Sequence, residues 1–510
     1  MSFFLYFLFV VATSFFTYFY RYNVPSQPFW DEPYHISAAQ KYLHGVYFME
    51  QHPPLGKLLI ALGEKLTHSN QKTDQFINTE YARDFDTTIP GTSTVQHTSF
   101  TGYRLFPALM GWLTSVIIFL IFFAITGNPA VSALLSFLYI FDNALIVHSR
   151  GAMVDTPLTF FGMLTLLFFF HVVKASDDIY RHVTLSFFFG LSFALAFTTK
   201  LVGLILVLLF PIACILLFPH WKKIVLLVVA SLVGFLIGYA GVWQTHFALG
   251  SRIVPELPDN GYFQASPAYK KILAEHKNTL LSSFPVMLHD SINYVSYYSK
   301  GVPRLDLCKS EENGSPAYFW PLGGRTINYR WEKQDHWENI KDYKTRYLYL
   351  VPNPVSWGLG LLGVLLSIIL VVSSFLTEQQ KKMKNRSLMI VMLCLYVGYM
   401  VAILQLSRVM YLYHYFLPLL FSYILFGLSF MSIERIGSLV LTASRKTVIL
   451  TILSILIFAG YQYYRPLSYY EFIGDKEFEH RSILPIWELS CVNCKKVNSL
   501  AIPPSQNSDQ

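Results

Sequence analysis

Long apolar segments recur along this 510-residue chain, and they constrain its fold more than any other feature. A helix needs about 20 mostly apolar residues to cross a bilayer, and about eleven stretches reach that length. Only 14% of the residues are charged, whereas a soluble domain carries about 25%. The sequence therefore predicts an all-α polytopic membrane protein, with spans near residues 3–22, 103–125, 130–148, 153–173, 183–199, 200–218, 223–242, 353–376, 387–407, 411–432 and 446–464.

The lysines and arginines between these segments predict the orientation of the chain. Three basic clusters, Lys222-Lys223, Lys381–Arg386, and Arg435 with Arg445-Lys446, share one side of the membrane if the N-terminus is cytoplasmic. Cytoplasmic loops carry the excess of basic residues, so this orientation is favoured. The first segment could be a signal peptide, but it lacks a basic leader and a small-residue cleavage site, which favours a retained span.

This orientation divides the chain into four parts. Two long polar segments share the non-cytoplasmic side, and the first of them, residues 23–102, belongs to the N-terminal module. We expect an N-terminal transmembrane catalytic module, a second outer loop, a C-terminal four-helix membrane module and an outer tail, at residues 1–242, 243–352, 353–464 and 465–510.

The first outer loop contains a short amphipathic stretch. Apolar residues recur at helical spacing over residues 55–67, with Lys57, Glu64 and Lys65 between them. The stretch is too short to span a bilayer, and Pro53-Pro54 gives it a stiff entry. We therefore expect a helix that lies in the membrane interface.

Two adjacent carboxylates, Asp31 and Glu32, stand where the first outer loop leaves the first span. Charged groups at the mouth of a span are costly unless they face water or a charged ligand. The same loop adds His35, His52 and Lys57. A functional role is the favoured interpretation of the carboxylate pair, because adjacent like charges repel each other.

More polar side chains from distant spans are expected near the same membrane face. Each has a structural alternative that stays open: cations at span ends snorkel to the interface, Asp155 and Arg150 could form only a structural salt bridge, and His414 could be a satisfied core histidine. The candidates are Arg104, Arg150, Asp155, Lys200, Arg408 and His414.

Carboxylates together with convergent cations suit the transfer of a sugar from a lipid phosphate. The leaving phosphate is a weak base, so it needs positive charge, which Arg and Lys supply. A positioned carboxylate can remove the proton of the incoming hydroxyl. A retaining mechanism would need a second carboxylate as nucleophile; Glu32 is an unfavourable choice, since neighbours on an extended chain point apart, and a single inverting displacement is expected.

Other classes of function find little support in the composition. The net charge of +8 comes from scattered clusters, and no nucleic-acid-binding motif is recognisable. The histidines and carboxylates show no metal-ligand spacing, so we expect a reaction without a metal or other cofactor. Cys491 and Cys494 form a lone CxxC, for which a small disulfide or two free thiols is favoured over zinc.

Seven motifs resemble the protein O-mannosyltransferases that use dolichyl-phosphate mannose, a family of the GT-C glycosyltransferase superfamily. They follow the family's order along the chain. They are Asp31-Glu32, Gln51-His52-Pro53-Pro54-Leu55-Gly56-Lys57, Tyr103-Arg104-Leu105-Phe106-Pro107-Ala108-Leu109, Asp142-Asn143 through Ser149-Arg150 to Asp155, Thr199-Lys200-Leu201-Val202-Gly203, Phe319-Trp320-Pro321-Leu322 with Asn353-Pro354-Val355-Ser356-Trp357, and Arg408-Val409-Met410-Tyr411-Leu412-Tyr413-His414-Tyr415-Phe416-Leu417-Pro418.

The resemblance implies a GT-C fold and roles for individual residues. Asp31 would be the catalytic base, and Glu32 would help to place the acceptor or the sugar. The lipid phosphate would be bound by cations, and His414 and Arg408 would help to complete the site. Residues 243–352 are too few for the β-trefoil MIR domain of eukaryotic members, which implies a MIR-less, bacterial-like protein that uses a polyprenyl-phosphate sugar. The cations at the phosphate would be Arg104, Arg150 and Lys200.

The predicted function is therefore that of an inverting membrane glycosyltransferase. It would move a sugar, expected to be mannose, from a polyprenyl or dolichyl phosphate to a protein Ser/Thr hydroxyl. A lipid or glycolipid acceptor, as in aminoarabinose transfer, is an open alternative, because acceptor choice depends on variable loops. A transporter of lipid-linked sugars is disfavoured, since the chain shows no inverted repeat. The active site would face the bacterial periplasm or exterior, or the ER lumen.

Overall fold

The computed structural model describes residues 2–79, 98–174, 178–257, 261–309, 312–333, 344–376, 383 and 385–490. Three sequence predictions lie outside these residues: the state of Cys491 and Cys494, the end of the outer tail, and three of the four basic residues of the cluster at 381–386.

Within the described part of the chain, nine helices are long and apolar enough to cross a membrane. They follow nine of the eleven expected segments, so a polytopic helical membrane protein is confirmed. The nine are α1 (Ser2–Phe19), α4 (Thr101–Thr126), α7 (Asp155–Val173), α8 (Ile179–Phe197), α10 (Trp221–Leu249), α13 (Pro354–Leu376), α15 (Arg386–Leu404), α16 (Phe416–Ser432, preceded by the turn η6, Leu412–Tyr415) and α17 (Ala443–Tyr469).

The other two expected spans are interrupted. The segment expected at 130–148 consists of α5 (Pro129–Ile140) and α6 (Asn143–Ser149), which are bent by 66° relative to each other. The segment expected at 200–218 begins as a 3₁₀ helix, η3 (Leu201–Leu208), and continues as α9 (Leu209–Leu217).

Asp142 explains the bend between α5 and α6. One carboxylate oxygen caps α6 by accepting a hydrogen bond from the Leu145 backbone N–H. The other accepts hydrogen bonds from Trp357 Nε1 at 2.7 Å and the Tyr423 hydroxyl at 2.8 Å. A buried carboxylate needs such partners, and this one receives them from α13 and α16.

Close packing between α8 and α10 depends on glycine. A Cβ atom at Gly190 would lie 1.9 Å from the Ser231 carbonyl oxygen, and one at Gly234 would lie 2.1 Å from that of Phe187. Small residues allow membrane helices to approach closely in this way.

Both long loops contain short helices, and the second also contains strands. The first contributes α2 (Glu32–Leu43) and α3 (Leu55–Thr67), and the interfacial position of α3 stays a prediction. The strands β1, β2 and β5 form an antiparallel sheet in the order β1-β2-β5, which was not expected from the sequence. The second loop and the C-terminal segment contribute α11 (Pro267–Ala274), η4 (Leu281–Ser283), α12 (Phe284–Gly301), η5 (Ala317–Leu322), β1 (Ile327–Lys333), β2 (Lys344–Leu350), β5 (Phe472–Gly474), α18 (Asp475–Glu479) and η7 (Pro485–Trp487).

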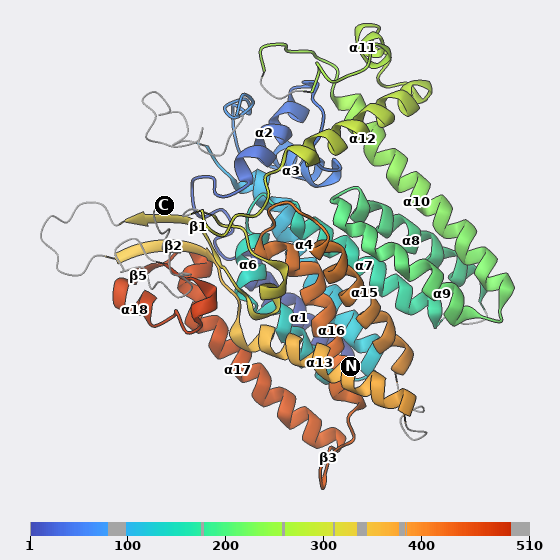
Figure 1. Cartoon of the computed structure of the whole chain (residues 1–510), viewed down its shortest axis with the longest axis vertical. Helices are drawn as coiled ribbons and strands as arrows, with labels where there is room; N and C mark the ends of the chain where they lie inside the picture. The colour runs from blue at the N-terminus through green and yellow to red at the C-terminus, as the bar shows by residue number, and fades with distance from the viewer. Residues whose placement is uncertain are drawn as a thin grey trace, which may run out of the picture.

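The elements of both loops gather at one end of the helix bundle (Figure 1). At the opposite end lies a small hairpin of β3 (Arg435–Ile436) and β4 (Leu439–Val440). The first loop is fastened to its neighbours by backbone hydrogen bonds, from Tyr47 to Arg252 and from Leu55 to Thr198. One end of the bundle therefore combines polar segments that are far apart in the sequence.

Candidate active site

Asp31 stands at the N-terminal end of α2, directly before its first residue. Its side chain is half-buried, and its Oδ2 accepts a hydrogen bond from the Tyr413 hydroxyl at 3.1 Å. Burial raises the pKa of this carboxyl, while Lys200 and the hydrogen bond from Tyr413 act in the opposite direction. A carboxylate whose pKa is raised is a stronger base than one with the ordinary pKa.

Glu32 is the next residue, and its environment is entirely different. Its carboxylate is fully buried and forms a bidentate ion pair with Arg104, at 2.7 Å to Nε and 2.8 Å to Nη2. Backbone N–H groups of Phe29 and Ala152 donate to the same two oxygens. The remaining bonds of Arg104 go to backbone carbonyls of Asn23, Pro25 and Gln27.

This pair ties the turn before α2 to α4. Because protein acceptors occupy every nitrogen of the Arg104 guanidinium and its side chain has no exposed surface, the group is not presented to a ligand in this structure. The arrangement favours a positioning role for Glu32 and Arg104.

A second ion pair lies beside Asp31. Lys200, the residue before η3, places Nζ 2.7 Å from Oδ1 of Asp155, the first residue of α7. The same ammonium lies 5.3 Å from the centre of the Tyr413 ring. Lys200 and Asp155 are thus brought together with Asp31 around one tyrosine.

His148 extends this cluster to the second outer loop. Its Nε2 lies 3.4 Å from Oδ2 of Asp155, and its Nδ1 lies 2.6 Å from the Tyr329 hydroxyl on β1. The imidazole also stacks on the Tyr413 ring, with the ring centres 5.0 Å apart.

Lys57 and His52, from the first-loop motif, have different partners. Lys57 is buried at the start of α3 and pairs with Glu50, with 2.8 Å between Nζ and Oε2. His52 is half-buried, and burial together with Lys57 and Lys200 lowers its pKa well below the usual value. His35 is buried in α2 with Nδ1 2.7 Å from the Ala152 carbonyl, and burial lowers its pKa to about 3.

Arg150 and His414 make mainly structural contacts. Arg150 donates to the backbone carbonyls of Ser468 and Arg21, and its guanidinium lies 4.5 Å from the centre of the Tyr469 ring. His414 caps η6 through a hydrogen bond between Nδ1 and the backbone of Tyr411. The salt bridge between Asp155 and Arg150, considered from the sequence, is replaced by the pair of Asp155 and Lys200.

Arg408 lines a groove of about 780 Å³ next to these groups. Its Nε is buried and has no hydrogen-bond partner among the described residues. Two more cations of the second loop, Lys300 and Arg304, share the groove, and apart from a few serines the remaining lining is mainly apolar and aromatic: Pro53, Phe197, Leu201, Tyr239, Trp243, Ile292, Val295, Val302 and Leu406.

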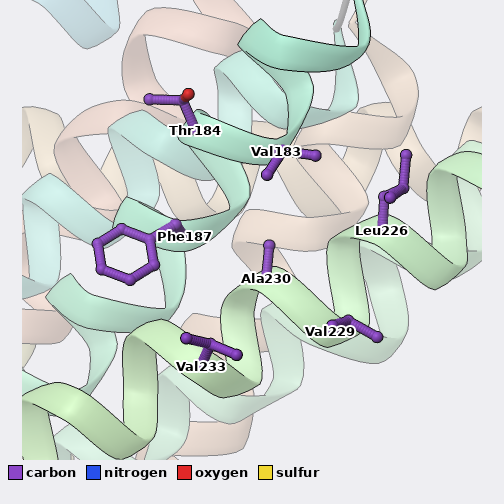
Figure 2. A pocket seen from close by; sticks show the side chains of 7 residues that line it. All are labelled: Val183, Thr184, Phe187, Leu226, Val229, Ala230 and Val233. Carbon is purple, nitrogen blue, oxygen red and sulfur yellow. The ribbon is translucent and has the colours of Figure 1, made fainter.

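A second groove of about 440 Å³ lies between α8 and α10, away from these polar groups (Figure 2). Its lining contains no charged side chain: Val183, Thr184, Phe187, Leu226, Val229, Ala230 and Val233. It offers no group for binding a phosphate.

Metal ligands are not clustered in the described part of the chain, where no group of three or more His, Cys, Asp or Glu side chains could hold an ion.

Sequence reasoning missed four residues whose side chains form ion pairs or hydrogen bonds in the candidate site. Tyr413 and His148 lie inside motifs that the sequence singled out, but no role was assigned to them. Glu50 directly precedes the His-Pro-Pro motif, so its pairing with Lys57 had a local signal. Tyr329 had none, because it lies in a strand of the second loop, outside the motifs that the sequence singled out.

Comparison with known proteins identifies the family. Residues 8–253 match the family model described as dolichyl-phosphate-mannose-protein mannosyltransferase. Residues 304–487 match the model of the C-terminal four-transmembrane region of protein O-mannosyltransferase.

Curated relatives agree over about two fifths of the chain. The chain is 28% identical over 205 residues to protein O-mannosyl-transferase 2 of Danio rerio, covering 39% of this chain and 25% of the relative. It is 28% identical over 205 residues to dolichyl-phosphate-mannose–protein mannosyltransferase 4 of Schizosaccharomyces pombe, covering 39% and 24%. The matched region spans about a quarter of the length of these curated relatives.

The fold matches that of a solved structure of the same family. The S. cerevisiae protein O-mannosyltransferase Pmt1-Pmt2 complex bound to the sugar donor aligns with a TM-score of 0.78 at 13% identity, covering 96% of this chain and 93% of that one. The expected GT-C fold is confirmed. The chain belongs to the family of dolichyl-phosphate-mannose protein mannosyltransferases.

Proposed function

We propose that this protein transfers mannose from a polyprenyl phosphate to a Ser/Thr hydroxyl of a protein, with inversion at the sugar carbon. One observation carries the proposal: of the two adjacent carboxylates, Asp31 is partly exposed, whereas Glu32 has no exposed surface. The Asp31 carboxylate accepts a single side-chain hydrogen bond within the described residues, from Tyr413. The Glu32 carboxylate, in contrast, accepts hydrogen bonds from Arg104 and from two backbone N–H groups.

The chemistry follows from that difference. Asp31 takes the proton of the acceptor hydroxyl, whose oxygen forms a bond to C1 of the sugar. The bond between C1 and the phosphate oxygen breaks, and polyprenyl phosphate leaves with the electron pair. Since Glu32 and Asp155 are both engaged in close ion pairs, neither is available as a nucleophile, and a single displacement inverts the centre.

The groove beside the site supports a lipid-phosphate donor. Its apolar lining suits a polyprenyl chain, and its three cations can balance the phosphate charge. Because Arg408 Nε has no described partner, Arg408 is the first candidate for the phosphate, with Lys300 and Arg304 beside it. Such side chains can act without a metal ion, so we propose a metal-independent reaction.

The cations predicted from sequence then receive different roles. Lys200 stays near the reaction centre, where it favours the ionised form of Asp31. Arg104 and Arg150 hold backbone segments around the site. His52 borders the groove through its neighbour Pro53.

The membrane side follows from the basic clusters. We propose that the site faces away from the cytoplasm, because the opposite orientation would translocate the basic loops. A periplasmic or exterior site in a bacterium and a lumenal site in the ER both satisfy this argument, and a bacterial-like member without a MIR domain stays our prediction.

The test uses membranes that contain the full chain and a radiolabelled polyprenyl-phosphate mannose. Wild type should label a Ser/Thr peptide, and Asp31→Asn should lower the rate by about 10²- to 10⁴-fold. Asp306→Asn, at an exposed aspartate of the second loop, is the matched control.

Three results would contradict the proposal. Asp31→Asn membranes that retain wild-type turnover would remove Asp31 as the base. Label recovered only in lipid would replace the protein acceptor with a lipid. Activity that disappears with EDTA and returns with a divalent cation would overturn metal independence.

A further inference from the structure

The strand β1 reaches from the second outer loop to the turn that carries Asp31. Its pairing with β2 shifts register between Asn328 and Arg330, so that Tyr329 is an extra residue in the ladder. Such a bulge redirects a side chain away from regular alternation. Tyr329 is buried although it belongs to a strand whose far end is exposed.

The Tyr329 ring packs against the two residues that precede Asp31. Its centre lies 5.6 Å from that of Phe29, in a stacked arrangement, and 5.4 Å from that of Trp30. The next residue of the strand, Arg330, donates a hydrogen bond to the Pro28 carbonyl.

The turn beneath Tyr329 has an unfavourable backbone. Trp30 has a φ of +53°, in the left-handed region that bulky residues rarely adopt. Such a conformation persists only where surrounding contacts enforce it. Tyr329 and Arg330 supply contacts of that kind from another loop.

The Tyr329 hydroxyl makes a second connection to Asp31. It lies 2.6 Å from Nδ1 of His148, whose ring stacks on Tyr413. Tyr413 in turn donates its hydroxyl hydrogen to Asp31. Two routes, one through the turn and one through His148 and Tyr413, thus lead from one strand residue to the same carboxylate.

We propose that Tyr329 is a positioning residue through which the second outer loop fixes the orientation of Asp31. The proposal rests on Asp31 acting as base in the proposed function. The second outer loop would then affect the rate of the reaction as well as the fold. The reason is that a displaced carboxylate is badly placed to take the proton of the acceptor hydroxyl.

Two variants separate the two routes. Tyr329→Phe keeps the ring on Phe29 and removes the hydroxyl at His148, and it should lower kcat by about 10-fold. Tyr329→Ala removes both contacts and should lower kcat on the order of 100-fold. In both, the KM for the donor should stay as in wild type, since the groove does not include Tyr329.

Tyr349→Phe is the matched control. Tyr349 is a buried tyrosine on the neighbouring strand, and its hydroxyl interacts with Ser490 instead of the site. Loss of the Tyr349 hydroxyl should leave kcat unchanged. A wild-type kcat for both Tyr329 variants, or an equal fall for Tyr349→Phe, would overturn the proposal.

Hydrogen exchange gives a readout that does not need transferase activity. Amides of residues 29–32, 34 and 35 should exchange faster in Tyr329→Ala than in wild type or Tyr349→Phe, because the turn loses its support. Unchanged exchange there would reject the positioning role. If wild type itself transfers no mannose, the proposed function fails, and exchange alone decides whether Tyr329 holds the turn.

Discussion

Glu32 and Arg104 form a bidentate ion pair in which neither side chain has any exposed surface. The pair stands one residue from Asp31 and joins the start of α2 to α4. Burying two charges is tolerable here because backbone groups satisfy most of their remaining hydrogen-bonding capacity.

Removing one partner of this pair should destabilise the protein strongly. We expect Glu32→Gln to lower the free energy of unfolding by about 3–5 kcal/mol, because Arg104 would keep a buried, uncompensated charge. Thermal unfolding of the purified protein measures the effect, and Lys271→Ala on the exposed surface of α11 should change nothing measurable. A normal melting temperature of Glu32→Gln together with a raised donor KM would instead indicate that Arg104 binds the phosphate.

Arg408 offers a matching prediction for donor binding. Arg408→Gln should raise the donor KM by about 10- to 100-fold, the effect of losing one charge-assisted hydrogen bond. Steady-state kinetics with varied donor and fixed acceptor peptide would show it, and Lys277→Gln, outside the groove, is the control. A larger effect on the KM for the acceptor than on that for the donor would place Arg408 on the acceptor side.

The pH profile tests the environment of Asp31. Transfer should increase as the pH rises through the pKa of this carboxyl, because the base must be ionised. The hydrogen bond from Tyr413 lowers that pKa against the raising effect of burial, so Tyr413→Phe should move the acid limb of kcat/KM upward by up to about one pH unit. Tyr464→Phe, which loses only a bond to the Arg481 carbonyl, should keep the wild-type profile. A downward shift in Tyr413→Phe would contradict the role of this bond.

Helix packing in the first loop gives a test that is independent of catalysis. A Cβ atom at Gly63 would lie 2.3 Å from the Gly102 carbonyl oxygen. We therefore expect Gly63→Ala to separate α3 from α4 and to cost about 1–3 kcal/mol of stability. Gly241→Ala on α10 meets no atom within 4 Å and should leave the melting temperature unchanged or slightly raised. Equal melting temperatures for the two variants would show that α3 can move to make room for the added methyl group.

The sequence could predict most of the helical architecture because each membrane span is encoded locally, in an apolar stretch of sufficient length. It could not predict the break after Ile140. That break depends on Trp357 and Tyr423, which satisfy a buried Asp142 from more than 200 residues away. The strand β5 was missed for a similar reason, since it joins the sheet from the far end of the chain.

The candidate site shows the same division. The position of Asp31 follows from its place after a span, and the sequence singled it out. The backbone partners of Arg104 could not be predicted, because every residue has a carbonyl oxygen and the sequence does not reveal which of them accept a hydrogen bond. Arg104 and Arg408 look alike in sequence, yet one is enclosed by acceptors and the other faces a groove.

The extra residue in β1 makes strand length as important as strand composition. Removing one residue near Asn328 would restore an unbroken ladder with β2 and turn the tyrosine toward the opposite face of the sheet. Such a deletion would leave every group around Asp31 chemically intact while detaching the second loop from it. A one-residue deletion and a side-chain substitution should therefore have the same effect on this carboxylate.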